Sequence, residues 1–108
     1  MGEPFQHVVL FRFPRELTSE EEEELRAIAT TWPADIGGFR ALRFGRALSR
    51  ERTGGYSHLL FCEFDDASAH DRYQPHPAHQ RFVERVRDLG VESLAFDCEV
   101  DATTDLLR

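Results

Sequence analysis

Apolar residues follow one another with little alternation in two short runs of the chain, Phe5–Phe13 and Tyr56–Phe64. Runs that are apolar at both odd and even positions are typical of strands covered on both faces. Two weaker runs, Phe39–Leu48 and Leu94–Val100, also carry apolar residues at strand-like spacing. The pattern therefore predicts four strands, the first and third of which are covered on both sides.

Two other segments follow the period of a helix. In each segment, residues at positions i, i+3, i+4 and i+7 form a stripe along one side of the helix. The first stripe is Leu25, Ile28, Ala29 and Trp32, and the second is His79, Phe82, Val83 and Val86. The first stripe predicts a helix from about residue 19 to 32 that buries these side chains. The second predicts a helix after the prolines at 75 and 77, with His79 on its buried face.

The start of the first helix carries a polar signature. Thr18 with Glu21, or Ser19 with Glu22, can form a capping box there. The glutamates at 20–24 lie at the positive end of the helix dipole, so we expect them to form a solvated first turn.

The elements occur in the order strand, helix, strand, strand, helix, strand. This order is typical of an α+β protein with the ferredoxin-like βαββαβ fold and a four-stranded antiparallel-type sheet. Right-handed crossovers are expected to place the first and third strands side by side and parallel at the centre, which would make His7 and His58 neighbours. By strand parity, His7 shares a face with Phe11, and His58 shares one with Leu60.

The sheet is predicted to be apolar on both faces, whereas the two helices can cover only one of them. Face-to-face packing of two sheets would cover the other, so we expect a homodimer. With 108 residues the chain is short enough for a single domain, residues 1–108 with a core over about 5–100.

Composition and charge exclude several classes of protein. A net charge of −7 argues against a nucleic-acid partner, which basic patches would have to contact. No run has the length of a membrane span or the pattern of a signal peptide, so we expect no membrane contact and a cytoplasmic protein. Cys62 and Cys98 are expected to be buried free thiols. All 13 basic residues are arginine, which is typical of a GC-rich bacterial genome.

The segment Tyr73–His79 places a phenol and two imidazoles within seven residues. Because histidine titrates near neutral pH and carries both a donor and an acceptor nitrogen, this density suggests a pocket. The helix stripe directs His79 toward the sheet, and Tyr73 is expected at the pocket mouth. His76, between two prolines, is expected in a turn or at a helix start. His70 is expected to be exposed.

Three motifs follow one another along the chain: His7–Phe13, Gly55–His58 and Tyr73–His79, which ends in His-Pro-Ala-His. Together they resemble the stress-responsive A/B barrel (Dabb) family of dimeric α+β barrels. The resemblance covers about residues 5–100. The family includes a plant polyketide cyclase that closes a ring by aldol condensation, without a cofactor, as well as bacterial members of unknown activity. The resemblance implies a homodimer that binds a small molecule.

The resemblance to the cyclase also implies roles for single residues. It implies that His79 is the general base and that Tyr73 holds the acyl carbonyl or the developing enolate. Both roles suit the chemistry of these groups, because a neutral imidazole can remove a proton between two carbonyls and a phenol can donate to an oxyanion. His7 and His58 match two further pocket histidines, and His76 matches the first histidine of His-Pro-Ala-His.

The rest of the pocket is predicted from faces and stripes. Besides the histidines, we expect five apolar residues of the strands and helices to contact the substrate: Phe11, Leu60, Leu25, Ile28 and Phe82. The plant cyclase has bulky aromatics where the first helix here offers Glu24, Leu25 and Ile28. The plant substrate and its alkyl-resorcylic product are therefore not carried over.

Each histidine also has a structural interpretation. His79 could be a core histidine bonded to a carbonyl, and Tyr73 an aromatic lid. His7 and His58 could pin two strands. Three histidines converging from two strands and a helix could bind zinc or copper, but their spacing matches no local ligand motif, so no metal is expected.

Three functions remain open. The first is a cofactor-free cyclase, a lyase-type enzyme that acts on a polyketide-like or aromatic carbonyl compound. The second is a non-catalytic, stress-associated homodimer that binds a ligand. The third is a cofactor-free monooxygenase of the dimeric α+β barrel type. The sequence leaves the substrate open.

Overall fold

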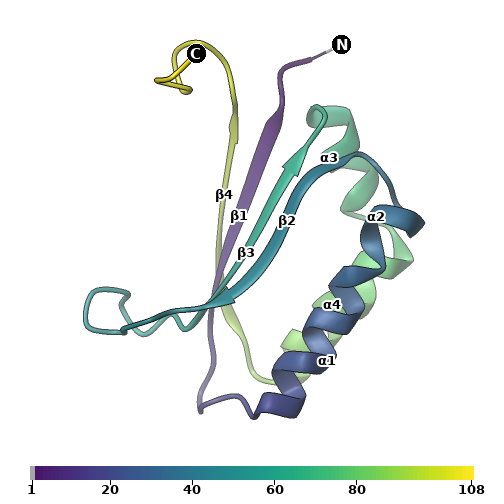
Figure 1. The fold of residues 1–108 in the computed structure, drawn as a ribbon. Coiled ribbons are helices and arrows are strands. Elements are labelled where there is room, and N and C mark those ends of the chain that lie inside the picture. Colours follow the sequence, from purple (N-terminus) through teal and green to yellow (C-terminus); the bar gives the residue numbers. More distant parts are fainter. Residues whose placement is uncertain (1) are drawn as a thin grey trace.

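The computed structural model describes residues 2–108, which form one four-stranded sheet with helices on a single face (Figure 1). The elements in chain order are β1 (Phe5–Arg12), α1 (Ser19–Thr30), α2 (Trp32–Asp35), β2 (Phe39–Arg46), β3 (His58–Phe64), α3 (Ala67–Tyr73), α4 (Pro77–Asp88) and β4 (Glu92–Glu99). The predicted ferredoxin-like α+β fold is confirmed. No helix in these residues is long and apolar enough to cross a membrane.

The strands lie in the order β2-β3-β1-β4, and every neighbouring pair is antiparallel. The expectation that the first and third strands run parallel was wrong. The connection through α1 makes β2 parallel to β1. The hairpin link after β2 then reverses the direction of the chain and places β3 between these two strands, so β3 is antiparallel to both. His7 therefore pairs with Cys62, and His58 pairs with Phe11, four positions farther along the sheet. The two histidines are not neighbours.

The first helix begins as the capping box predicts, with Thr18 as its N-cap. The Thr18 Oγ1 accepts a hydrogen bond from the Glu21 backbone N–H, while the Thr18 N–H donates to the Glu21 carboxylate. The helix ends at Thr30, earlier than expected, and Trp32 begins the separate turn α2, in which Pro33 occupies a first-turn position. Proline is favoured there because the first N–H groups of a helix have no intrahelical partner.

The core lies between the sheet and the helices. Trp32 is fully buried at its centre, and its indole N–H donates to the Ala78 carbonyl at 3.0 Å. This bond ties α2 to the first turn of α4. Cys62 and Cys98 are both free, as predicted, but Cys98 is only half-buried because it lies near the end of the edge strand β4.

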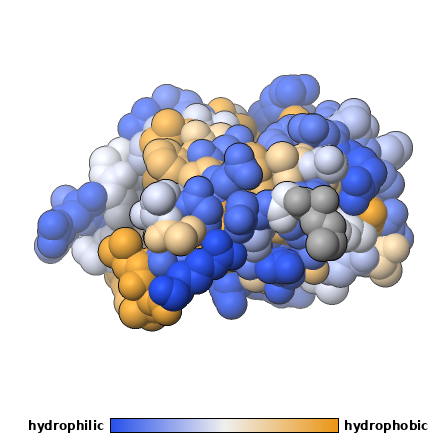
Figure 2. All heavy atoms as spheres, turned by 90° about the horizontal axis from the view of Figure 1, so that it is seen from above, coloured by the Kyte–Doolittle hydropathy of each residue, from blue (hydrophilic) through white to orange (hydrophobic). Residues whose placement is uncertain are grey.

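The opposite face of the sheet has no helix over it (Figure 1). Large apolar side chains there are exposed, with Phe96 at 67% and Leu94 at 54%. They alternate with Asp97 and Ala95, which point to the helix side. Seen from the end that carries both termini, hydrophobic and hydrophilic side chains are mixed on the surface (Figure 2).

Candidate active site

A cavity of about 380 Å³ lies between α4 and the sheet. Six of the nine residues predicted to form the site line it: His7, Phe11, Leu60, Tyr73, His79 and Phe82. The lining residues that were not predicted from the sequence include Ser93 and Ala95 on β4, and Arg87, the one arginine among the lining residues.

A backbone carbonyl fixes which ring nitrogen of His79 carries the proton. Its Nδ1 lies 2.9 Å from the Gln74 carbonyl oxygen. Because a carbonyl can only accept, Nδ1 carries the proton and donates, so the other ring nitrogen, Nε2, is unprotonated in the neutral ring. Burial lowers the His79 pKa below its ordinary value, although the Gln74 carbonyl opposes this. His79 is thus a neutral imidazole with a basic nitrogen at pH 7.

The turn before α4 explains this placement. His76 is the N-cap, and its Nδ1 accepts from the Ala78 N–H at 3.0 Å, while Pro77 occupies the first helical position. The expectation that His76 starts the helix is confirmed. The Gln74 carbonyl, at the end of α3, is thereby brought to the His79 ring. His79 is buried, as the stripe predicts.

Tyr73 lies beside His79, with ring centroids 4.0 Å apart. It is fully buried, so the expectation that it stands at the pocket mouth was wrong. Trp32 and Phe39 pack against it edge to face at 5.3 Å and 5.9 Å and close it off from solvent. Burial raises the pKa of the phenol well above its ordinary value, with Cys62 adding to the effect. The phenol therefore stays protonated and is a hydrogen-bond donor.

The Tyr73 hydroxyl is the one buried side-chain nitrogen or oxygen in residues 2–108 without a close hydrogen-bond partner, and the weakly polar Cys62 thiol adjoins it. A buried polar group left unpaired costs about 1–3 kcal/mol. Because Tyr73 also lines the cavity, a ligand oxygen could accept from this hydroxyl.

His7 lines the cavity beside this pair, and His70 packs against His7. His7 Nδ1 donates to the Asp97 carboxylate at 2.6 Å, across the β1–β4 ladder in which the two residues are paired. His70 is buried rather than exposed, so that expectation was wrong. Its ring lies 4.8 Å from His7 and stacks on Phe5 at 4.6 Å. Its i, i+3 spacing to Tyr73 on α3 was the signal that could have revealed this.

His58 belongs to a different cluster. Its Nε2 donates to the Glu22 carboxylate at 2.6 Å, and its Nδ1 accepts from the Ser57 hydroxyl at 2.7 Å. Arg46 binds the same carboxylate and lowers the Glu22 pKa to about 2. Both ring nitrogens are thus occupied, and His58 joins β3 to α1 instead of lining the cavity with His79.

Glu22 was expected to be solvated with the other glutamates, and that was wrong because it is buried. It precedes Leu25 by three residues and Ala29 by seven, so it lies on the buried stripe of α1. Leu25 and Ile28 pack in the core and do not line the cavity.

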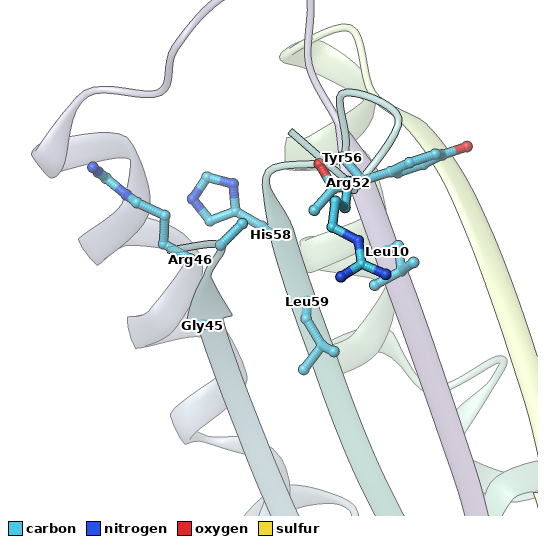
Figure 3. Close-up of a pocket in the computed structure, with 9 residues that line it drawn as sticks. Leu10, Gly45, Arg46, Arg52, Tyr56, His58 and Leu59 are labelled. Atoms are coloured by element: carbon cyan, nitrogen blue, oxygen red, sulfur yellow. The ribbon is translucent and has the colours of Figure 1, made fainter. Parts of the chain in front are cut away.

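A second hollow, of about 550 Å³, lies near the β2–β3 link, where Leu10, Leu59 and Tyr56 contribute to its lining (Figure 3). Arg46 and His58 point away from Leu10 and Leu59 in this view, toward α1 (Figure 3). Neither Tyr73 nor His79 reaches this hollow. Tyr73 and His79 therefore belong to the cavity under α4, whereas His58 lines the second hollow.

Cys62 is not a nucleophile in this state. It is buried beside Tyr73, and burial raises the pKa of its thiol to about 12. The thiolate is the reactive form, so the sulfur stays protonated near neutral pH.

Among protein families, the Stress responsive A/B Barrel Domain, Dabb, matches residues 5–100. The chain belongs to the Dabb family. Among curated proteins, this Dabb chain is similar to olivetolic acid cyclase from Cannabis sativa, with 24% identity over 93 residues, 85% of this chain and 92% of the cyclase.

Solved structures share the fold of this Dabb chain at low identity. A dimeric ferredoxin-like protein of unknown function from Thermobifida fusca aligns with a TM-score of 0.77 at 22% identity and covers 92% of both chains. A hydroxynitrile lyase from Passiflora edulis aligns with 0.79 at 13%, over 94% of this chain and 96% of the lyase. SnoaB, a cofactor-independent oxygenase from Streptomyces nogalater, aligns with 0.68 at 19%, over 92% and 94%. These neighbours show the fold alone.

Proposed function

We propose that this Dabb protein is a cofactor-free enzyme of the cyclase type, acting on a polyketide-like or aromatic compound with several carbonyls. The observation that carries the proposal is the pairing of His79 and Tyr73. A buried imidazole with a basic Nε2 lies 4.0 Å, ring to ring, from a protonated phenol whose hydroxyl has no partner. A base and an oxyanion donor on one cavity wall are the two groups that an aldol condensation needs.

The proposed reaction needs no oxidant, reductant or cofactor. His79 Nε2 takes a proton from the carbon between two carbonyls, and the resulting enolate attacks a distant ketone carbon of the same chain to form the new C–C bond. Tyr73 donates a hydrogen bond to the oxygen that gains negative charge. The His79 imidazolium then returns its proton to the alkoxide. The resulting hydroxyl leaves with a remaining proton of the attacking carbon as water, and enolisation of the ring carbonyls completes the aromatic ring.

The other cavity residues suit such a substrate. Phe11, Leu60 and Phe82 offer an apolar wall to an alkyl or aryl end. Arg87 on α4 offers a cation to an anionic end, since no ion pair within residues 2–108 engages it. We propose that the chain is also a homodimer, because the solved neighbours include dimeric ferredoxin-like proteins and the open sheet face carries exposed Leu94 and Phe96.

The test of the function uses a linear tetraketide thioester with purified protein, and compares ring-closed products with those formed in buffer. Tyr73→Phe keeps the ring and removes only the hydroxyl, so we expect about 100- to 1,000-fold slower ring closure. The fold should be as stable as the original or more stable, since the unpaired hydroxyl is gone. Val83→Ala, on α4 in the lining of the same cavity, is the control for a cavity change without chemistry. Equal product spectra for the original protein and Tyr73→Phe would refute the acid-base assignment. Dependence on dissolved oxygen would indicate a monooxygenase instead.

The homodimer has its own test. Phe96→Glu places a charge on the open sheet face, where a partner sheet would bury it, and we expect light scattering at micromolar concentration to change from dimer to monomer. Glu99→Gln, at the end of the same strand, is the control. A monomeric original protein would contradict the dimer.

A further inference from the structure

Three possible metal ligands converge next to the proposed acid-base pair. His7 of β1, His70 of α3 and Asp97 of β4 each bring one ligand atom to within 4.8 Å of the others. Three separate elements fix them, because His7 and Asp97 are paired across the β1–β4 ladder and His70 stacks on Phe5 beside them. Sequence reasoning did not find this set, because His70 was expected to be exposed and Asp97 was not considered.

The chemical state of these groups suits a metal ion. Both imidazoles are buried, whereas the Asp97 carboxylate is reached by solvent. Imidazole nitrogen and carboxylate oxygen are both common zinc ligands. Asp97 has no arginine among its ion-pair partners in residues 2–108, where it pairs with His7. The cluster therefore offers two imidazole nitrogens and one carboxylate with no arginine partner.

We propose that His7, His70 and Asp97 bind a divalent transition-metal ion, of which Zn²⁺ is the simplest probe. Ligand atoms on one tetrahedral zinc lie about 3.3 Å apart, given bonds of about 2.0–2.2 Å. The present 2.6 Å contact between His7 and Asp97 is a hydrogen bond whose proton the ion would replace. The Asp97 side chain is 40% exposed, which gives it room to rotate and gives the ion a path from solvent.

Three protein ligands leave a coordination position open, as in catalytic rather than structural zinc sites. Because His7 also lines the cavity under α4, the ion would adjoin the site of His79 and Tyr73, where a substrate oxygen could complete its coordination. The inference goes beyond the proposed function, since proton transfer by His79 requires no metal. Metal binding and ring closure are also measured separately, so either proposal can fail alone.

The experiment is a titration of chelator-treated protein with Zn²⁺ by calorimetry, and with Co²⁺ by visible absorption. We expect one ion per chain. His70→Phe keeps the ring that stacks on Phe5, and Asp97→Asn keeps an acceptor for His7, so both variants are expected to fold. Loss of a ligand should weaken binding by at least about 100-fold, beyond the loss known for residues that only orient ligands.

Two controls separate this site from adventitious binding. His76→Asn removes an imidazole outside the cluster but retains a side chain that caps α4, and Asp35→Asn removes an exposed carboxylate. Both should bind zinc as the original protein does. Thermal unfolding without metal checks that each variant is folded. The proposal is overturned if the original protein shows no saturable binding, or if either His70→Phe or Asp97→Asn binds as tightly as the original.

Discussion

His79→Ala is expected to lower kcat/KM for ring closure by about 100- to 10,000-fold, the usual contribution of a general base. The physical reason is that Nε2 is the basic nitrogen of the ring, since the Gln74 carbonyl fixes the proton on Nδ1. His79→Gln should lose as much activity while keeping an N–H for the same carbonyl. Steady-state kinetics on the reactive thioester measures both variants.

The pH profile tests the same residue independently. Burial lowers the His79 pKa below its ordinary value of 6.5, so the neutral, active ring persists to lower pH than in an exposed histidine. The fall of kcat/KM with decreasing pH should therefore have its midpoint below 6.5. His76→Asn is the control, because it changes a histidine that only caps the helix. Imidazole added to His79→Ala should restore part of the rate, whereas a full rate in His79→Ala without imidazole would show that His79 is not the base.

Glu22→Ala is expected to destabilise the fold by about 2–4 kcal/mol, the range for breaking a buried ion pair that leaves its partners unpaired. His58 would lose the acceptor of its Nε2–H, and Arg46 its carboxylate. Urea unfolding measures the change. Glu23→Ala is the matched control on the same helix, since Glu23 makes an exposed pair with Arg26, and its effect should stay below about 0.5 kcal/mol.

The contribution of Glu22 to the stability of the fold also depends on pH, and the pKa shift gives the direction. Its folded pKa, about 2, lies below the ordinary value of 4.5, so its stabilising effect is fully present above pH 4.5. The effect is lost as pH falls from 4.5 toward 2, because the unfolded chain then binds the proton more readily. The stability gap between the original protein and Glu22→Ala should therefore narrow over that range. Equal stability of Glu22→Ala and Glu23→Ala at pH 7 would contradict the buried cluster.

Local pattern was enough to predict several features of this structure. The period of the second helix put His79 on the buried side, and the Thr18 signature marked the start of α1. Both depend on residues within one or two turns of the chain. The same helical spacing, applied to Glu22 or His70, would have shown that each lies on the buried side of its helix. Glu22 was instead predicted to be solvated because of its charge, and His70, on a short helix, was predicted to be exposed.

Relations between distant elements were harder to predict. The direction of β3 relative to β1 depends on the whole path through α1 and β2, and the wrong direction made His7 and His58 neighbours. The burial of Tyr73 depends on Trp32 and Phe39, which come from elements far earlier in the chain. The pairing of His7 with Asp97 spans 90 residues. No periodicity within a short window contains that information.

The most direct test of the proposed chemistry is hydrogen exchange at the carbon between the two carbonyls of a β-keto thioester, followed by NMR in D₂O. If His79 is the base, the original protein should speed exchange above the rate in buffer, His79→Ala should lose the acceleration, and His76→Asn should retain it. Exchange at the buffer rate with saturating original protein, or undiminished acceleration by His79→Ala, would contradict the claim that this cavity performs acid-base chemistry.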